Sequence, residues 1–184
     1  MNKKSIKLNS GNIITIRKKL DADITKYWRI IANENVMSSK AIKANMGSGM
    51  DLKALYNTIM QMTEKRIVIK GMLQCLNMGI LTFNYDDFKK TNNYSIFAAC
   101  EAKEAIAHWK MILEKSTINP KEKAKKTLKG TGKKETFSSA KISSLIKILQ
   151  LKANKYDAEL AKFNDNTEID ITNNSEAFIE DIAA

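Results

Sequence analysis

Proline, glycine, cysteine and histidine are all scarce in this sequence. Its 184 residues include one proline, seven glycines, two cysteines and one histidine. Because proline and glycine punctuate turns and interrupt helices, their scarcity favours long helices over a turn-rich all-β fold. The two cysteines form no disulfide framework, so we interpret both as buried thiols, with a disulfide between adjacent helices as the alternative. No apolar run approaches the ~18 residues that a transmembrane helix needs.

The shortage of histidine and cysteine also restricts the chemistry available. His108, with Glu104 one turn before it, is the best metal pair, and neither a di-iron bundle nor a structural zinc site can be assembled around it. A nucleophilic pair would need His108 with Cys75 or Cys100, and neither cysteine lies in an electropositive setting. We therefore predict no catalytic residue, no metal and no cofactor, and we interpret the chain as non-enzymatic.

The longest periodic pattern extends from Asp51 to Met78. At ~1.5 Å per residue it predicts a helical rod roughly 40 Å long, with Gly79 as its stop. Its apolar face must pack on other helices, either of this chain or of a partner. We call this face the 52–76 ridge; its positions, at steps of three and four, are Leu52, Leu55, Ile59, Met62, Arg66, Ile69, Leu73 and Leu76. The first seven are our candidate protein interface.

Arg66 is the one charged position in the 52–76 ridge. An arginine buried without a partner would be destabilising by several kcal/mol. Three arrangements avoid that cost: the guanidinium reaches the edge of the ridge, it pairs with a facing acid, or it fixes the register of an assembly.

Shorter patterns predict the remaining elements. Lys4–Leu8 and Ile13–Arg17 flank Asn9-Ser10-Gly11-Asn12, which indicates a β-hairpin. Gly47-Ser48-Gly49 is a connector, with an anion-binding loop as the less favoured alternative. The predicted helices are Asp21–Asn33, one or two turns in Ser38–Ala44, a turn or short helix in Asn84–Lys90, Asn93–Lys115 and Ser138–Asn164.

Together these elements predict an all-α fold, a three- to four-helix bundle with a small N-terminal hairpin, a basic loop and an acidic C-terminal tail. The predicted divisions are a basic arm or hairpin at 1–19, a helical core at 20–115, a basic linker at 116–136, a C-terminal helix at 137–164 and an acidic tail at 165–184. Hydrophobic residues make up 43% and charged residues 28%, as in soluble globular proteins. With no signal peptide in Met1–Lys19, we expect a cytoplasmic location, or one inside a viral particle.

Charge is distributed very unevenly along the chain. Up to Lys162 there are 31 basic and 14 acidic residues, whereas the remainder holds six acids and no base. Lysines are concentrated between Lys115 and Lys134, where Glu122 is the one acid. Such a stretch can neutralise phosphates. The predicted nucleic-acid contacts are Lys121, Lys123, Lys125, Lys126, Lys129, Lys133 and Lys134.

We expect a non-enzymatic interaction protein of a nucleoprotein setting. No aromatic residue is interleaved with the lysines, so binding should be non-specific. Two alternatives for the lysines are a solvated loop and an internal partner for the acidic tail. The alternative function is a structural or adaptor subunit of a larger assembly, of viral or mobile-element type, that packs through the 52–76 ridge. Protein partners or self-association are expected, and a membrane partner is not.

Overall fold

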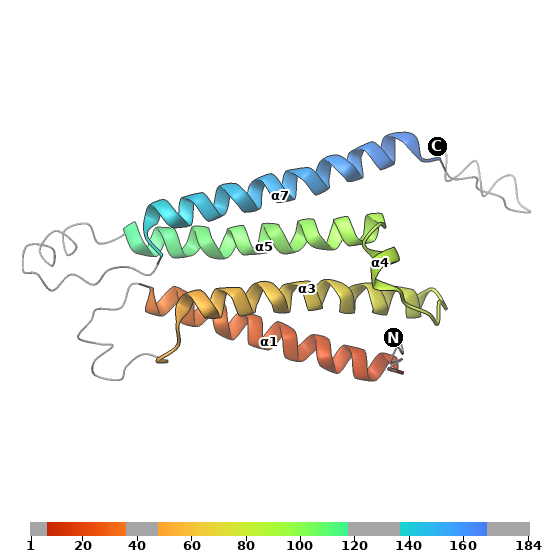
Figure 1. Cartoon of the computed structure of the whole chain (residues 1–184), viewed down its shortest axis with the longest axis horizontal. Coiled ribbons are helices and arrows are strands. Elements are labelled where there is room, and N and C mark those ends of the chain that lie inside the picture. The colour runs from red at the N-terminus through yellow and green to blue at the C-terminus, as the bar shows by residue number, and fades with distance from the viewer. Residues whose placement is uncertain (1–6, 36–47, 118–136, 169–184) are drawn as a thin grey trace, which may run out of the picture.

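The structure is a computed structural model that describes residues 7–35, 48–117 and 137–168. Within those ranges every element is helical and no strand occurs, so the predicted all-α class is confirmed. Four long helices form a bundle, and a short fifth lies in the link between the second and third of them (Figure 1). The helices are α1 (Ser10–Glu34), α3 (Leu52–Asn77), α4 (Tyr85–Phe88), α5 (Asn92–Thr117) and α7 (Ser139–Asn166).

The four long helices alternate in direction along the bundle. α1 packs on α3, α5 packs on α7, and the contact of α3 with α5 joins the two pairs. In Figure 1, α3 lies between α1 and α5, whereas α7 lies on the far side of α5. α7 is therefore an edge helix, with one side against α5 and the opposite side turned away from the bundle.

The predicted central helix is confirmed almost to the residue. Asp51 is its N-cap, and the Asp51 carboxylate accepts a hydrogen bond from the backbone N–H of Lys53 at 2.9 Å. Gly79 follows the last turn with a φ of +74°, a left-handed conformation that glycine adopts without strain. The predicted starts of α4 and α7 also hold, because Asn84 and Ser138 cap them.

The predicted N-terminal hairpin is wrong where the structure describes it. Ile13–Arg17, its expected second strand, is helical and belongs to α1. The Asn9 side chain accepts a hydrogen bond from the Asn12 N–H at 2.8 Å, and the Asn12 side chain accepts one from the Asn9 N–H at 3.4 Å. The two asparagines thus form a capping box instead of a turn. Residues 1–6 and the predicted turns at Ser38–Ala44 lie outside the described residues.

The 52–76 ridge packs inside this chain. Five of its eight residues are buried and the other three are partly buried, because α1 and α5 cover them. The seven residues predicted to form an interface therefore line the interior of the bundle instead of an outer face. The buried five are Leu52, Leu55, Ile59, Arg66 and Ile69, and the partly buried three are Met62, Leu73 and Leu76.

The apolar core is divided into two ends by the charged side chain of Arg66. Toward the start of α3 lies an aromatic cluster, in which Trp109 is 5.3 Å from Trp28 and 4.9 Å from Phe137 between ring centroids. Toward the end of α3, smaller clusters pack α3 on α1 and on α4, α5 and α7. Arg66 lies between these two ends in the sequence of α3.

Gly71 allows α4 to pack directly against α3. The Phe88 ring lies over Gly71, and a Cβ atom added there would be 2.4 Å from Phe88 Cζ. Phe88 is buried and contacts the rings of Phe83 and Tyr94 at centroid distances of 5.3 and 5.7 Å. A glycine inside a helix normally lowers stability, but here its missing side chain creates the space for Phe88.

We predict that Gly71→Ala destabilises the protein. The helix-propensity gain of roughly 1 kcal/mol should be outweighed by displacement of the Phe88 ring, with a net loss of about 1–3 kcal/mol in the free energy of unfolding. Urea denaturation would measure it. In a Phe88→Ala background the same change should become neutral or stabilising. A stabilised Gly71→Ala protein that keeps Phe88 would contradict the packing described above.

Candidate nucleic-acid interface

Both internal connections outside the described residues join helices at the same end of the bundle. α1 ends at Glu34 and α5 at Thr117, and these ends lie beside the starts of α3 and α7 (Figure 1). Residues 36–47 and 118–136 connect these helix ends. We call the described residues around them the loop end; they are 26–35, 48–62, 105–117 and 137–150.

A buried asparagine, Asn35, binds the backbone of Phe137, the first described residue after 118–136. The Asn35 side-chain amide donates to the Phe137 carbonyl oxygen at 2.9 Å and accepts from the Phe137 N–H at 2.8 Å. Asn35 is fully buried and Phe137 is 3% exposed. One side chain thus satisfies both the N–H and the carbonyl group of Phe137, a residue 102 positions away. The two residues that flank 118–136, Thr117 and Phe137, are therefore both part of the bundle.

The described surface of the loop end is strongly basic. It carries seven exposed basic residues against three acids. Two of the acids are engaged by backbone, since Glu34 Oε1 accepts from the Ser48 N–H at 2.6 Å and Asp51 caps α3. The seven bases are Lys26, Arg29, Lys53, Lys110, Lys115, Lys141 and Lys147, and the third acid is Glu114.

The two connecting segments add to this charge. By sequence, residues 36–47 and 118–136 contain nine lysines and two acids. With the loop end they hold 16 bases and five acids, and this excess of 11 equals the formal net charge of +11 of the whole chain. All other residues balance, with 15 bases and 15 acids. The seven predicted phosphate-binding lysines lie in 118–136, outside the described residues, so each remains a prediction.

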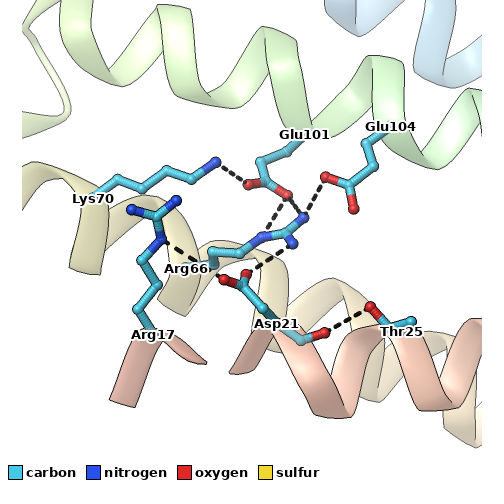
Figure 2. A network of polar contacts seen from close by, with 7 residues as sticks. All are labelled: Arg17, Asp21, Thr25, Arg66, Lys70, Glu101 and Glu104. Carbon is cyan, nitrogen blue, oxygen red and sulfur yellow. Dashed lines mark hydrogen bonds and ion pairs between the residues drawn. The ribbon is translucent and has the colours of Figure 1, made fainter. Parts of the chain in front are cut away.

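The second charged cluster of the described chain surrounds Arg66 in the middle of the bundle (Figure 2). Arg66 Nε donates to Glu101 Oε2 at 3.0 Å, and a terminal guanidinium nitrogen also contacts that oxygen. The other donors reach Asp21 Oδ1 at 3.1 Å and Glu104 Oε2 at 2.7 Å. Lys70 Nζ completes the cluster by donating to Glu101 Oε1 at 2.8 Å. α1, α3 and α5 each contribute to it.

This network is charge-balanced, and its centre is buried although Arg17, Asp21 and Glu104 at its edge are exposed. Arg17 lies 3.7 Å from Asp21, so the cluster contains three bases and three acids. The side chains of Arg66 and Glu101 are 9% and 3% exposed. Burial acts to lower the pKa of the Arg66 guanidinium, but the hydrogen bond and charge of Glu101, with the charge of Glu104, raise it overall. Arg66 thus stays a cation, and of the three arrangements considered for it the structure shows pairing with facing acids.

A partly buried carboxylate, that of Glu64, joins α4 to the core. Glu64 accepts hydrogen bonds from the hydroxyl groups of Tyr85, at 2.7 Å, and Tyr94, at 3.2 Å. Burial, followed by the charge of Glu64, raises the pKa of Tyr94 well above its usual range. The phenol therefore remains protonated and acts as a donor. These contacts attach α4 and α5 to α3, a structural role.

The histidine and the cysteines form no reactive pair. His108 stacks on Trp28 with 4.8 Å between ring centroids, and burial lowers its pKa although Glu104 raises it. This agrees with its interpretation as a partly buried helix residue. Both cysteines are free thiols, but the prediction that both are buried is wrong: Cys75 is partly buried, and Cys100 is exposed on α5 next to the buried Ala99.

We predict that Asn35→Asp loosens the loop end. The isosteric carboxylate keeps the acceptor for the Phe137 N–H but loses the donor to its carbonyl oxygen, and it places a charge in a buried position. A loss of about 1–3 kcal/mol in the free energy of unfolding is expected, measurable by urea denaturation. The neighbouring exposed Asn33→Asp is the matched control and should cost little. Equal effects of the two substitutions would argue against a special role for Asn35.

We also predict that Arg66→Met strongly destabilises the bundle. Removing the cation leaves the buried Glu101 with Lys70 as its main counter-charge, and breaking a buried pair typically costs about 3–5 kcal/mol. The double variant Arg66→Met/Glu101→Leu should recover much of this loss because it removes both charges. Glu104→Gln, at a 44% exposed side chain, should cost much less. Thermal and urea unfolding measure the stability of all three variants. If the loss of stability in the double variant equals the sum of the losses in Arg66→Met and Glu101→Leu, the pairing is refuted.

No group of three or more histidine, cysteine or acidic residues in the described ranges is placed to hold a metal ion. Within the same ranges no helix has the length and apolar character needed to cross a membrane. Comparisons with protein-family models, with curated proteins and with solved structures gave no match for this chain.

Proposed function

We propose that this chain is a non-enzymatic helical interaction protein of a nucleoprotein setting, which contacts nucleic acid without sequence specificity through the lysine-rich segment 116–136. The observation that carries the proposal is the separation of charge. The loop end and its two connecting segments hold the entire excess of positive charge, whereas the rest of the chain is balanced. A polyanion is the partner that such a one-sided distribution attracts.

The bundle supports this role by presenting the lysines from a fixed base. The lysines lie between Thr117, the last residue of α5, and Phe137, which Asn35 holds through two hydrogen bonds. Lysines attached at both flanks lose less conformational entropy on binding than lysines on a single-ended arm. Exposed bases on the ends of all four long helices, among them Arg29, Lys53 and Lys115, extend the same positive surface.

The expected lack of sequence specificity follows from residue types. Segment 118–136 contains no aromatic residue. The next aromatic residue, Phe137, is buried against Trp109 and Tyr56 and is committed to the core. Base stacking is therefore not offered from this segment, and phosphate contacts by lysine carry no sequence information.

The alternative function, assembly through the 52–76 ridge, lacks a surface in the described chain. α1 and α5 of the same molecule cover the ridge, and the charge network occupies its centre at Arg66. An assembly role would have to use a different face.

We predict salt-dependent binding to duplex DNA that depends on the 118–136 lysines. Changing Lys121, Lys125, Lys129 and Lys133 to Gln should reduce the slope of log affinity against log salt by about 3.6 if all four neutralise phosphates, at ~0.9 per contact. Fluorescence anisotropy at several salt concentrations measures the slope, and parallel titrations with RNA identify the preferred nucleic acid.

The matched control removes the same charge from positions outside the loop end. Lys7, Lys18, Lys19 and Lys65 are all exposed and lie outside the loop end. Their change to Gln should alter the salt slope far less than the 118–136 variant does. Equal effects of the two variants would show that net charge alone drives binding, and absence of salt-sensitive binding by the unchanged protein would refute the proposed function.

A further inference from the structure

The outward side of α7 exposes two large apolar side chains. Ile148 is 58% exposed and Leu151 is 71% exposed, although they lie in the middle of a regular helix. α7 packs on α5 through its other side, where Ile142, Leu149 and Ala153 are buried. α7 is the edge helix of the bundle (Figure 1), and the exposure of Ile148 and Leu151 shows that no described helix covers them.

Lysines surround this apolar pair. Lys152 and Lys155 lie four and seven residues after Ile148, so a helix places them on the same side. The one acid among them, Glu159, lies 3.9 Å from Lys155 and also accepts from the Ser95 hydroxyl at 3.3 Å. We call this surface the α7 flank; it comprises Ile148, Leu151, Lys152, Lys155 and Lys162, all exposed. A second copy of the same flank would be repelled by its lysines, so the surface suits an acidic, apolar partner.

Residues 169–184 have the complementary composition. By sequence this segment contains no lysine or arginine, four acids and five large apolar residues. The acids are Asp170, Glu176, Glu180 and Asp181, and the apolar residues are Ile169, Ile171, Phe178, Ile179 and Ile182. It combines the two properties that the α7 flank would recognise, negative charge and large hydrophobic side chains.

We propose that residues 169–184 dock on the α7 flank of their own chain. α7 ends at Asn166, and Leu151 lies 15 residues earlier, about 22 Å back along the helix. Sixteen residues span up to roughly 50 Å when extended, so the segment reaches the flank easily. The lysines of 118–136 precede the start of α7, which lies about 40 Å from its end at Asn166. Docking on the α7 flank therefore closes a shorter loop than docking on those lysines would, and a shorter loop costs less entropy. The covalent tether also gives the segment a high effective concentration at the flank.

This docking has a consequence for charge. It pairs the acids of 169–184 with Lys152 and Lys155, which lie outside the loop end, and it leaves the lysines of 118–136 open to a partner. The proposal does not require that nucleic acid is the partner, because it rests on α7 and the segment that follows it.

Carbodiimide cross-linking of the full chain tests the proposal. The reagent joins a carboxylate to a lysine in direct contact, and mass spectrometry of an equal mixture of ¹⁴N and ¹⁵N protein separates links within one molecule from links between two. We expect links from Glu176, Glu180 or Asp181 to Lys152 or Lys155, within one isotope form. Links mainly to the lysines of 118–136, links that combine the two isotopes, or no links from these acids would each overturn the proposal.

A pair of substitutions checks the apolar part of the surface. Ile148→Ser/Leu151→Ser should lower the yield of these links at least threefold without lowering the melting temperature, because both side chains are more than half exposed. The matched control is Ile14→Ser/Ile16→Ser on the exposed side of α1, at 43% and 39% exposure. An equal yield in the two variants would overturn docking at Ile148 and Leu151. DNA affinity, measured separately, reports on the proposed function alone.

Discussion

The ion network around Arg66 is the constraint on which the arrangement of the helices depends. Apolar ridges spaced by three and four residues can pack in several registers, because leucine, isoleucine and methionine tolerate exchange. A buried guanidinium does not tolerate a shift, since each donor must meet an acid. Arg66 meets acids from α1 and α5, so these helices are held in one register against α3. That register also determines which residues meet at each end of the bundle, among them Asn35 and Phe137.

Much of the fold was predictable because it depends on local signals. The Asp51–Met78 helix has a strong apolar period, an acidic N-cap and a glycine stop, and all three act within a few residues. The N-terminal prediction failed for a local reason as well. Asn9-Ser10-Gly11-Asn12 suits a hairpin turn, but Asn9 and Asn12 also suit a capping box, and the burial of Ile13 against α3 favours the helix. Tertiary packing decided between two locally acceptable conformations.

The candidate site was predictable only in part, because its geometry is non-local. The lysines of 118–136 are visible in the sequence, but the exposed bases that extend their surface come from four separate helices. The Asn35–Phe137 pair joins residues 102 positions apart, and no pattern near either residue indicates it. The sequence indicates only weakly that Glu101 and Glu104 face Arg66. The two acids are three residues apart, beside the buried alanines that let α5 approach α3.

The charges that hold the bundle together and the charges proposed to bind a partner are different groups in different places. Arg66, Lys70 and Glu101 neutralise one another in the interior, and their mutual attraction is screened little by salt. The excess bases of the loop end are exposed, so salt screens them strongly and their loss removes few internal contacts. Partner binding should therefore respond steeply to ionic strength under conditions in which the fold does not. This separation allows a small bundle to carry a high one-sided charge without losing its core.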